Sequence, residues 1–138
     1  MNSTKFLLDT NYILGLAKGQ PDVIDNIKQR GADSRWYGFS SISRMESLGF
    51  TAITPEEEKV IASLLGKLRY FPITPKIAAS TIILRSRCKL KLPDAVILAT
   101  AHVHRLELLT LDEDLLKQHR QNRSLLAQLG RFLNQRII

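Results

Sequence analysis

Four acidic residues stand where strands end or helices begin, and their carboxylates could meet in one cleft: Asp9, Glu46, Asp94 and Asp112. Carboxylates without histidine or cysteine partners suit hard cations such as Mg²⁺ or Mn²⁺. Two such ions about 3.5–4 Å apart stabilise the attacking and leaving oxygens when a phosphodiester bond is displaced in line. Taken together, the acids predict a site for metal-dependent phosphodiester chemistry.

Each of these acids also has a structural explanation. Asp9 and Asp112 could cap the helices that follow them, because Asp is a favoured N-cap residue. Glu46 completes a capping-box pattern with Ser43, and Asp94 stands in what we expect to be the first turn of a helix. Helix N-termini favour an acid by about 0.3–1 kcal/mol. The catalytic interpretation therefore depends on the four carboxylates converging.

Apolar runs alternate with helical patterns along the chain. Strands are expected over residues 6–8, 36–39, 70–73 and 106–111, and the first is an unbroken apolar run ending at Asp9. Thr54, Pro55 and Glu57 predict a sharp helix start, with a hydroxyl at the N-cap, proline at N1 and glutamate at N3. Further helices are expected over about 12–18, 22–30, 43–48, 55–68, 75–87 and 95–101, after 112–114, and over 124–138 as a docked tail.

This alternation predicts a single domain over residues 1–138, built as a three-layer α/β/α sandwich around a mostly parallel sheet. The ends of the first and fourth strands should then be neighbours at the C-terminal edge of the sheet. Asp9 and Asp112 would meet there, at the edge where open α/β sheets bind their ligands.

The net charge of +7 is unevenly distributed: residues 1–69 carry +1 and residues 70–138 carry +6. Such a basic half is typical of a protein that binds a polyanion. A run of alternating basic residues lies just before Asp94 and could hold phosphates: Arg85, Arg87, Lys89 and Lys91. A solvated charged face is the simpler explanation for the same run.

The remaining composition narrows the class of protein. Cys88 is the only cysteine, which excludes an internal disulfide framework and suits a reducing cytoplasm. No apolar stretch approaches the roughly 20 residues that span a bilayer, so no membrane association is expected. His102 and His104 are expected in surface or capping roles, because water activated by a metal ion needs no histidine base.

Four segments of the chain resemble, in order and at plausible spacing, the signature segments of PIN-domain nucleases: residues 7–11 (LLDTN), 40–46 (SSISRME), 92–101 (LPDAVILATA) and 109–114 (LTLDED). More narrowly, the chain resembles the small single-domain VapC-type toxins of toxin–antitoxin pairs. The resemblance implies Mg²⁺- or Mn²⁺-dependent endonucleolytic cleavage of RNA, inhibition by a cognate antitoxin and a homodimer.

The resemblance also assigns roles to individual residues. Asp9, Glu46, Asp94 and Asp112 match the acidic quartet that binds the metal ions, and Asp114 matches a frequent accessory acid. The matching polar neighbours of the site are Thr10, Asn11 and Thr110. Leu111 departs from the family, whose members often carry a basic or small residue at that position.

Two other functions compete with a metal-dependent ribonuclease. A PIN-like module that binds RNA or protein without cleavage is disfavoured, because it has no reason to keep four mutually repelling acids. An aspartyl-phosphate domain also places an acid after its first strand. The haloacid-dehalogenase pattern needs a second aspartate where this chain has Asn11, and the acid pair and lysine of receiver domains are missing.

Overall fold

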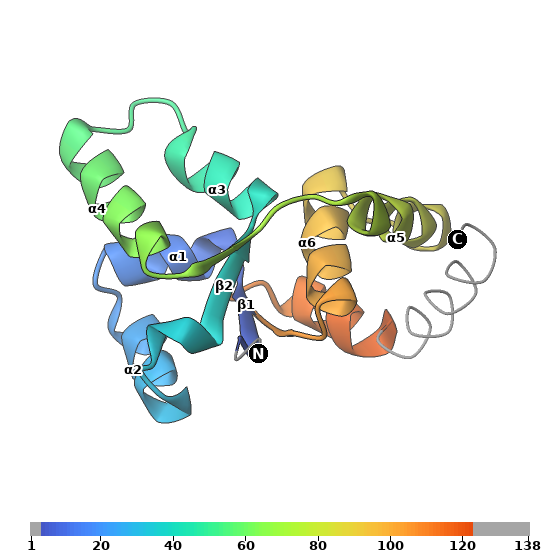
Figure 1. Ribbon diagram of the computed structural model, residues 1–138, viewed down its shortest axis with the longest axis horizontal. Coiled ribbons are helices and arrows are strands. Elements are labelled where there is room, and N and C mark those ends of the chain that lie inside the picture. Colours follow the sequence, from blue (N-terminus) through green and yellow to red (C-terminus); the bar gives the residue numbers. More distant parts are fainter. Residues whose placement is uncertain (1–3, 123–138) are drawn as a thin grey trace.

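A four-stranded parallel sheet runs through the centre of the protein (Figure 1). The computed structural model describes residues 4–122, so the expected tail helix over 124–138 lies outside the described residues. The strands follow the order β3-β2-β1-β4, with β1 between two neighbours. Their bounds are β1 Phe6–Leu8, β2 Tyr37–Ser40, β3 Arg69–Phe71 and β4 Glu107–Leu109.

Helices connect the strands as right-handed crossovers require in a parallel sheet. At the start of α4 the capping box is formed: Thr54 accepts from the backbone N–H of Glu57, and Glu57 accepts from that of Thr54. No helix in the described range is long and apolar enough to span a membrane. The bounds are α1 Thr10–Ala17, α2 Pro21–Arg30, the 3₁₀ turn η1 Ser34–Trp36, α3 Ser41–Leu48, α4 Pro55–Gly66, α5 Pro75–Arg87 and α6 Leu92–Val103, and residues 113–122 are also helical.

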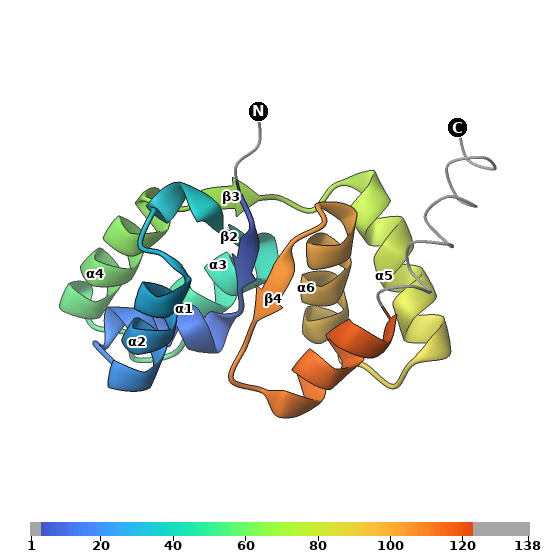
Figure 2. The ribbon, with the colours of Figure 1, turned by 90° about the horizontal axis from the view of Figure 1, so that it is seen from below.

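The alternation of side chains along β1 creates two separate cores, one on each face of the sheet. Leu7, fully buried, packs with α5, α6 and the helical segment 113–122. Leu8, 1% exposed, packs on the other face with α1, α2 and α4. Figures 1 and 2 show the helices on both sides of the sheet, which confirms the three-layer α/β/α architecture.

The structure corrects the sequence-based boundaries around α3 and β4. Strand β2 runs to Ser40, which is itself the N-cap of α3 and accepts a hydrogen bond from the N–H of Ser43. The structural alternative for Glu46, a capping box with Ser43, is therefore wrong, and Glu46 lies in the second turn of the helix. Strand β4 spans three residues, because the chain leaves the sheet at Thr110 to bond with α1 and its own turn.

Candidate active site

Asp9 is the most deeply buried of the acids, with 7% of its surface exposed. It directly follows β1 and caps α1, with Oδ1 accepting from the N–H of Thr10 at 2.7 Å. Its Oδ2 accepts from the hydroxyl of Thr110 at 2.7 Å. Burial raises the pKa of Asp9, the two hydrogen bonds oppose this rise, and the charges of Asp94 and Glu46 add to it. Asp9 is therefore both a helix cap and a member of a group of interacting acids.

Asp94 lies in the first turn of α6, at the edge of a helix whose residues 95–101 are buried. It is not the cap of this helix, because the N-cap residue is Lys91. Partial burial raises the pKa of Asp94, and the charges of Asp112 and Glu46 raise it further. Lys91 acts in the opposite direction and stabilises the charged carboxylate.

The other two acids of the quartet are exposed. Glu46 Oε1 accepts a 2.7 Å hydrogen bond from the hydroxyl of Thr10. Asp112 Oδ1 accepts from the N–H of Leu115 at 3.1 Å and so caps the helical segment 113–122. Asp114 is exposed in that segment and takes no part in the charge interactions of Asp9 and Asp94.

Thr110 and Asn11 join the exit of β4 to the start of α1. Besides donating to Asp9, the Thr110 hydroxyl accepts from Asn11 Nδ2 at 3.2 Å and from the N–H of Asp112 at 3.0 Å. Asn11 Oδ1 accepts from the N–H of Leu111 at 3.1 Å. The expected polar neighbours thus form one network, which fixes Asp9 relative to the backbone of Asp112.

Charge interactions connect all four members of the quartet. The charge of Asp9 interacts with those of Asp94 and Glu46. The charge of Asp94 interacts in addition with those of Glu46 and Asp112. As they stand, no three His, Cys, Asp or Glu side chains in the described range are arranged to hold a metal ion. The donor set nevertheless fits a hard divalent cation, because every donor is an oxygen and the mutual repulsion is relieved by positive charge.

The basic run is exposed along its whole length. Arg85 and Arg87 lie in the last turn of α5, Lys89 lies in the connection, and Lys91 immediately precedes α6. Of these residues, Lys91 is the one whose charge acts on an acid of the quartet, Asp94. The run therefore begins at the candidate site and leads away from it along α5.

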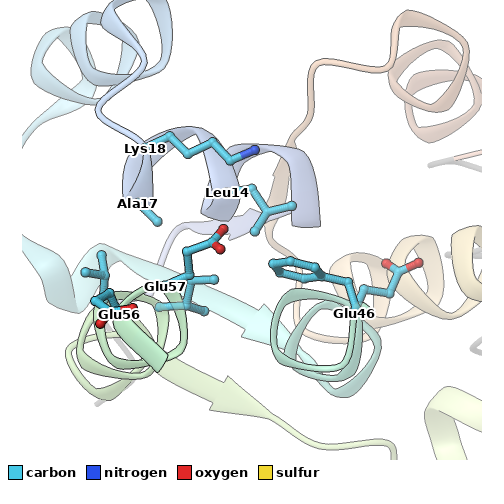
Figure 3. A pocket seen from close by; sticks show the side chains of 9 residues that line it. Leu14, Ala17, Lys18, Glu46, Glu56 and Glu57 are labelled. Atoms are coloured by element: carbon cyan, nitrogen blue, oxygen red, sulfur yellow. The ribbon is translucent and has the colours of Figure 1, made fainter. Parts of the chain in front are cut away.

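A groove of about 370 Å³ lies beside the site, between α1, α3 and α4 (Figure 3). Its lining is mostly apolar, and sequence analysis did not anticipate it, because the groove forms only where α1 packs against the later helices α3 and α4. Glu46 belongs both to this groove and to the interacting acids. The lining residues are Leu14, Ala17, Lys18, Glu46, Phe50, Glu56, Glu57, Val60 and Ile61.

Sequence analysis considered the serines before Glu46 only as helix caps and did not predict that two of them are buried near the acids. Ser40 and Ser43 are both 0% exposed, and Ser43 Oγ lies 3.2 Å from the hydroxyl of Thr10. The capping-box pattern with Glu46 would make Ser43 the N-cap, but the N-cap is Ser40 and Ser43 lies three residues later in the first turn. The serine immediately after the strand was the available signal, because a hydroxyl at a strand-to-helix junction is a strong N-cap candidate.

The family and the fold are shared with known proteins. The PIN domain family model matches residues 6–120. A solved chain from a toxin–antitoxin complex of Klebsiella pneumoniae is 33% identical, with 78% of this chain and 87% of that chain covered and a TM-score of 0.68. FitAcB of Neisseria gonorrhoeae is 25% identical, with 83% and 93% covered and a TM-score of 0.69.

A more distant structure has the same fold. VapBC2 from Rickettsia felis, bound to a promoter DNA fragment, is 17% identical over 83% of this chain and 92% of that chain, with a TM-score of 0.69. Comparison with curated proteins finds no match.

Proposed function

This chain belongs to the PIN-domain family, and from that membership we propose that it is a metal-dependent endoribonuclease, the toxin of a toxin–antitoxin pair. The observation that carries the proposal is the set of charge interactions linking Asp9, Glu46, Asp94 and Asp112 beyond the ends of β1 and β4. A parallel sheet binds ligands at the C-terminal edge where its strand order reverses, and two of these acids, Asp9 and Asp112, follow the strands β1 and β4 that meet there.

The four carboxylates would hold two Mg²⁺ or Mn²⁺ ions, with Asp114 as an accessory acid. The ions would supply an activated water and stabilise the charge that develops on the phosphate. Thr110 and Asn11 keep Asp9 oriented, and Lys91 partly balances the charge of Asp94. No histidine base is needed in this arrangement.

RNA is the proposed substrate because the acids border a basic surface. An acidic cleft by itself repels a polyanion, so binding needs cations next to it. The exposed run at Arg85, Arg87, Lys89 and Lys91 supplies them and begins beside Asp94. These cations would hold the phosphates that flank the scissile bond.

An antitoxin is the proposed protein partner, because the similar chain from Klebsiella pneumoniae comes from a toxin–antitoxin complex. The groove between α1, α3 and α4 has a mostly apolar lining, with the acids Glu56 and Glu57 and the base Lys18 among its lining residues. An amphipathic helix with an apolar face and basic flanks complements this surface. Family membership and exposed apolar side chains such as Ile82, which is 70% exposed, also support a homodimer.

A matched pair of substitutions tests the nuclease proposal. Asp94 and Asp22 each follow a proline and each lie in the first turn of a helix, but only Asp94 interacts with the other acids. Asp94→Asn should reduce Mg²⁺-dependent cleavage of an RNA panel by more than about 100-fold, beyond the 10–100-fold typical of groups that only orient ligands. Asp22→Asn should leave cleavage unchanged.

Chelation gives the second arm of the test. Cleavage by the wild-type protein should stop in EDTA and return when Mg²⁺ or Mn²⁺ is added. Cleavage that survives exhaustive chelation would contradict the two-metal site. Binding of RNA without cleavage under any metal condition would instead favour the alternative, a PIN-like binding module.

A further inference from the structure

We propose that Ser43 is a positioning residue that orients Glu46 through the hydroxyl of Thr10, an inference that rests on the proposed function of Glu46 as a metal ligand. Ser43 lies inside α3, three residues before Glu46, and is 0% exposed. Its Oγ is 3.2 Å from Thr10 Oγ1 and 3.5 Å from Ser40 Oγ. Three hydroxyls from α1, α3 and the end of β2 therefore stand in a row that ends at Glu46.

Proton counting gives this row a direction. Thr10 has one hydroxyl proton and two acceptors, Glu46 Oε1 at 2.7 Å and Ser43 Oγ at 3.2 Å. The proton goes to the carboxylate, because that contact is shorter and a charged acceptor makes the stronger bond. The contact between Thr10 and Ser43 is then satisfied when Ser43 donates, and Ser40 donates to Ser43 in turn.

The resulting chain runs from Ser40 through Ser43 and Thr10 to Glu46. Its first two members are fully buried, and the backbone N–H of Ser43 also donates to Ser40 at 3.2 Å. Bonds that all point in one direction polarise one another, which strengthens the last bond to the carboxylate. This hydrogen-bond chain begins at buried serine hydroxyls in the core. It ends at the exposed side chain of Glu46, which is the group that needs to be held in place.

Glu46 needs this support because it is exposed and projects from the second turn of α3. A free glutamate side chain samples several rotamers, and fixing it in one of them costs side-chain entropy. Figure 3 shows the Glu46 carboxylate directed away from Glu56, Glu57 and Lys18, out of the adjoining groove. The bond from Thr10 holds the carboxylate in this direction, and Thr10 directly follows Asp9.

The same helix offers a matched control. Ser47 lies one turn after Ser43, is also 0% exposed, and its Oγ has no hydrogen-bond partner among the described residues. Ser43→Ala should weaken Mg²⁺ binding to the RNA-free protein by about tenfold, the lower end of the range for groups that orient metal ligands. Ser47→Ala should bind Mg²⁺ as the wild type does. Titration calorimetry measures both values without relying on cleavage.

A double-mutant cycle tests the route through Thr10. If Ser43 acts only through Thr10, then Thr10→Val with Ser43→Ala should bind Mg²⁺ no more weakly than Thr10→Val alone. Additive losses would overturn the chain, as would equal affinities for Ser43→Ala and Ser47→Ala. The conservative variant Thr10→Ser keeps the donor and should bind as the wild type does.

A metal-free readout separates this proposal from the proposed function. In the apo protein, side-chain NMR couplings should show one χ1 rotamer for Glu46 in the wild type and in Ser47→Ala, and rotamer averaging in Ser43→Ala. Unchanged couplings in Ser43→Ala would overturn the positioning role. If the wild type shows neither Mg²⁺ binding nor cleavage while the couplings change as expected, the nuclease proposal fails and the hydroxyl chain stands.

Discussion

The hydroxyl of Thr110 donates a 2.7 Å hydrogen bond to Oδ2 of Asp9, a residue 101 positions earlier in the chain. The bond crosses from the end of β4 to the end of β1, the two strands that adjoin where the sheet order reverses. The same hydroxyl accepts from Asn11 Nδ2 and from the N–H of Asp112. One side chain thus sets the spacing between two of the acids.

Thr110→Val, which keeps the shape and removes the hydroxyl, should destabilise the apo protein by about 1–3 kcal/mol, because a buried carboxylate loses a donor. It should also slow cleavage, since Asp9 is no longer tied to the Asp112 turn. Urea denaturation and cleavage rates measure the two effects. Thr110→Ser keeps the donor and should retain most of the activity. Equal activity of the Val and Ser variants would contradict the bridging role.

Asp94→Asn should stabilise the metal-free protein at pH 7, by less than about 1 kcal/mol because the site is partly solvated. The pKa of Asp94 is higher in the folded protein than in the unfolded chain. At a pH above the unfolded-state pKa, ionisation of Asp94 therefore lowers the stability of the wild type, and this loss disappears as the pH falls. The advantage of the variant should therefore shrink between pH 7 and pH 4. Thermal melts in EDTA measure it, and saturating Mg²⁺ should reverse the order of stability. A variant that is less stable than the wild type in EDTA at pH 7 would contradict the repulsion.

Neutralising the basic run should change the salt dependence of RNA binding. Lys89→Gln with Lys91→Gln should reduce the slope of log K against log salt by about 1.4 for single-stranded RNA, because each lost phosphate contact removes about 0.7. Lys28→Gln with Lys59→Gln makes the same charge change on α2 and α4 and should leave the slope unchanged. Binding is measured in EDTA, which prevents cleavage. Equal slopes for the two double variants would mean that Lys89 and Lys91 do not contact RNA phosphates and only form part of a solvated charged face.

His104 should make the protein more sensitive to mild acid. Burial lowers the pKa of His104, Arg69 and Lys76 lower it further, and its Nε2 is buried with no partner among the described residues. The unfolded chain therefore takes up a proton below about pH 6.5 before the folded protein does, so stability falls as the pH drops through this range. His104→Phe keeps a ring on Phe71, at 4.5 Å in the wild type, and should lose less stability between pH 8 and pH 5.5. Parallel losses in urea denaturation would contradict this assignment.

Local signals in the sequence were sufficient for the architecture. Thr54, Pro55 and Glu57 satisfy the first turn of α4 by themselves, so the start of that helix could be predicted from four consecutive residues. The apolar run at Phe6–Leu8 predicted a strand covered on both faces, and the alternation of strands and helices predicted parallel pairing. These features depend on neighbours in sequence, which is why periodicity and capping reveal them. The acids themselves were identified by residue type and by family resemblance.

The tertiary structure decided how the acids are held. The competing structural explanation of Glu46 was a bond within its own helix turn, but its partner is Thr10, which follows another strand. The network at Thr110 likewise joins segments distant in sequence, because it links the exit of β4 to Asp9 and Asn11. No local pattern encodes such contacts, because they exist only when β1, β2 and β4 lie side by side and bring their ends together. The sequence alone determined which residues could do chemistry, and packing determined which of them face one another.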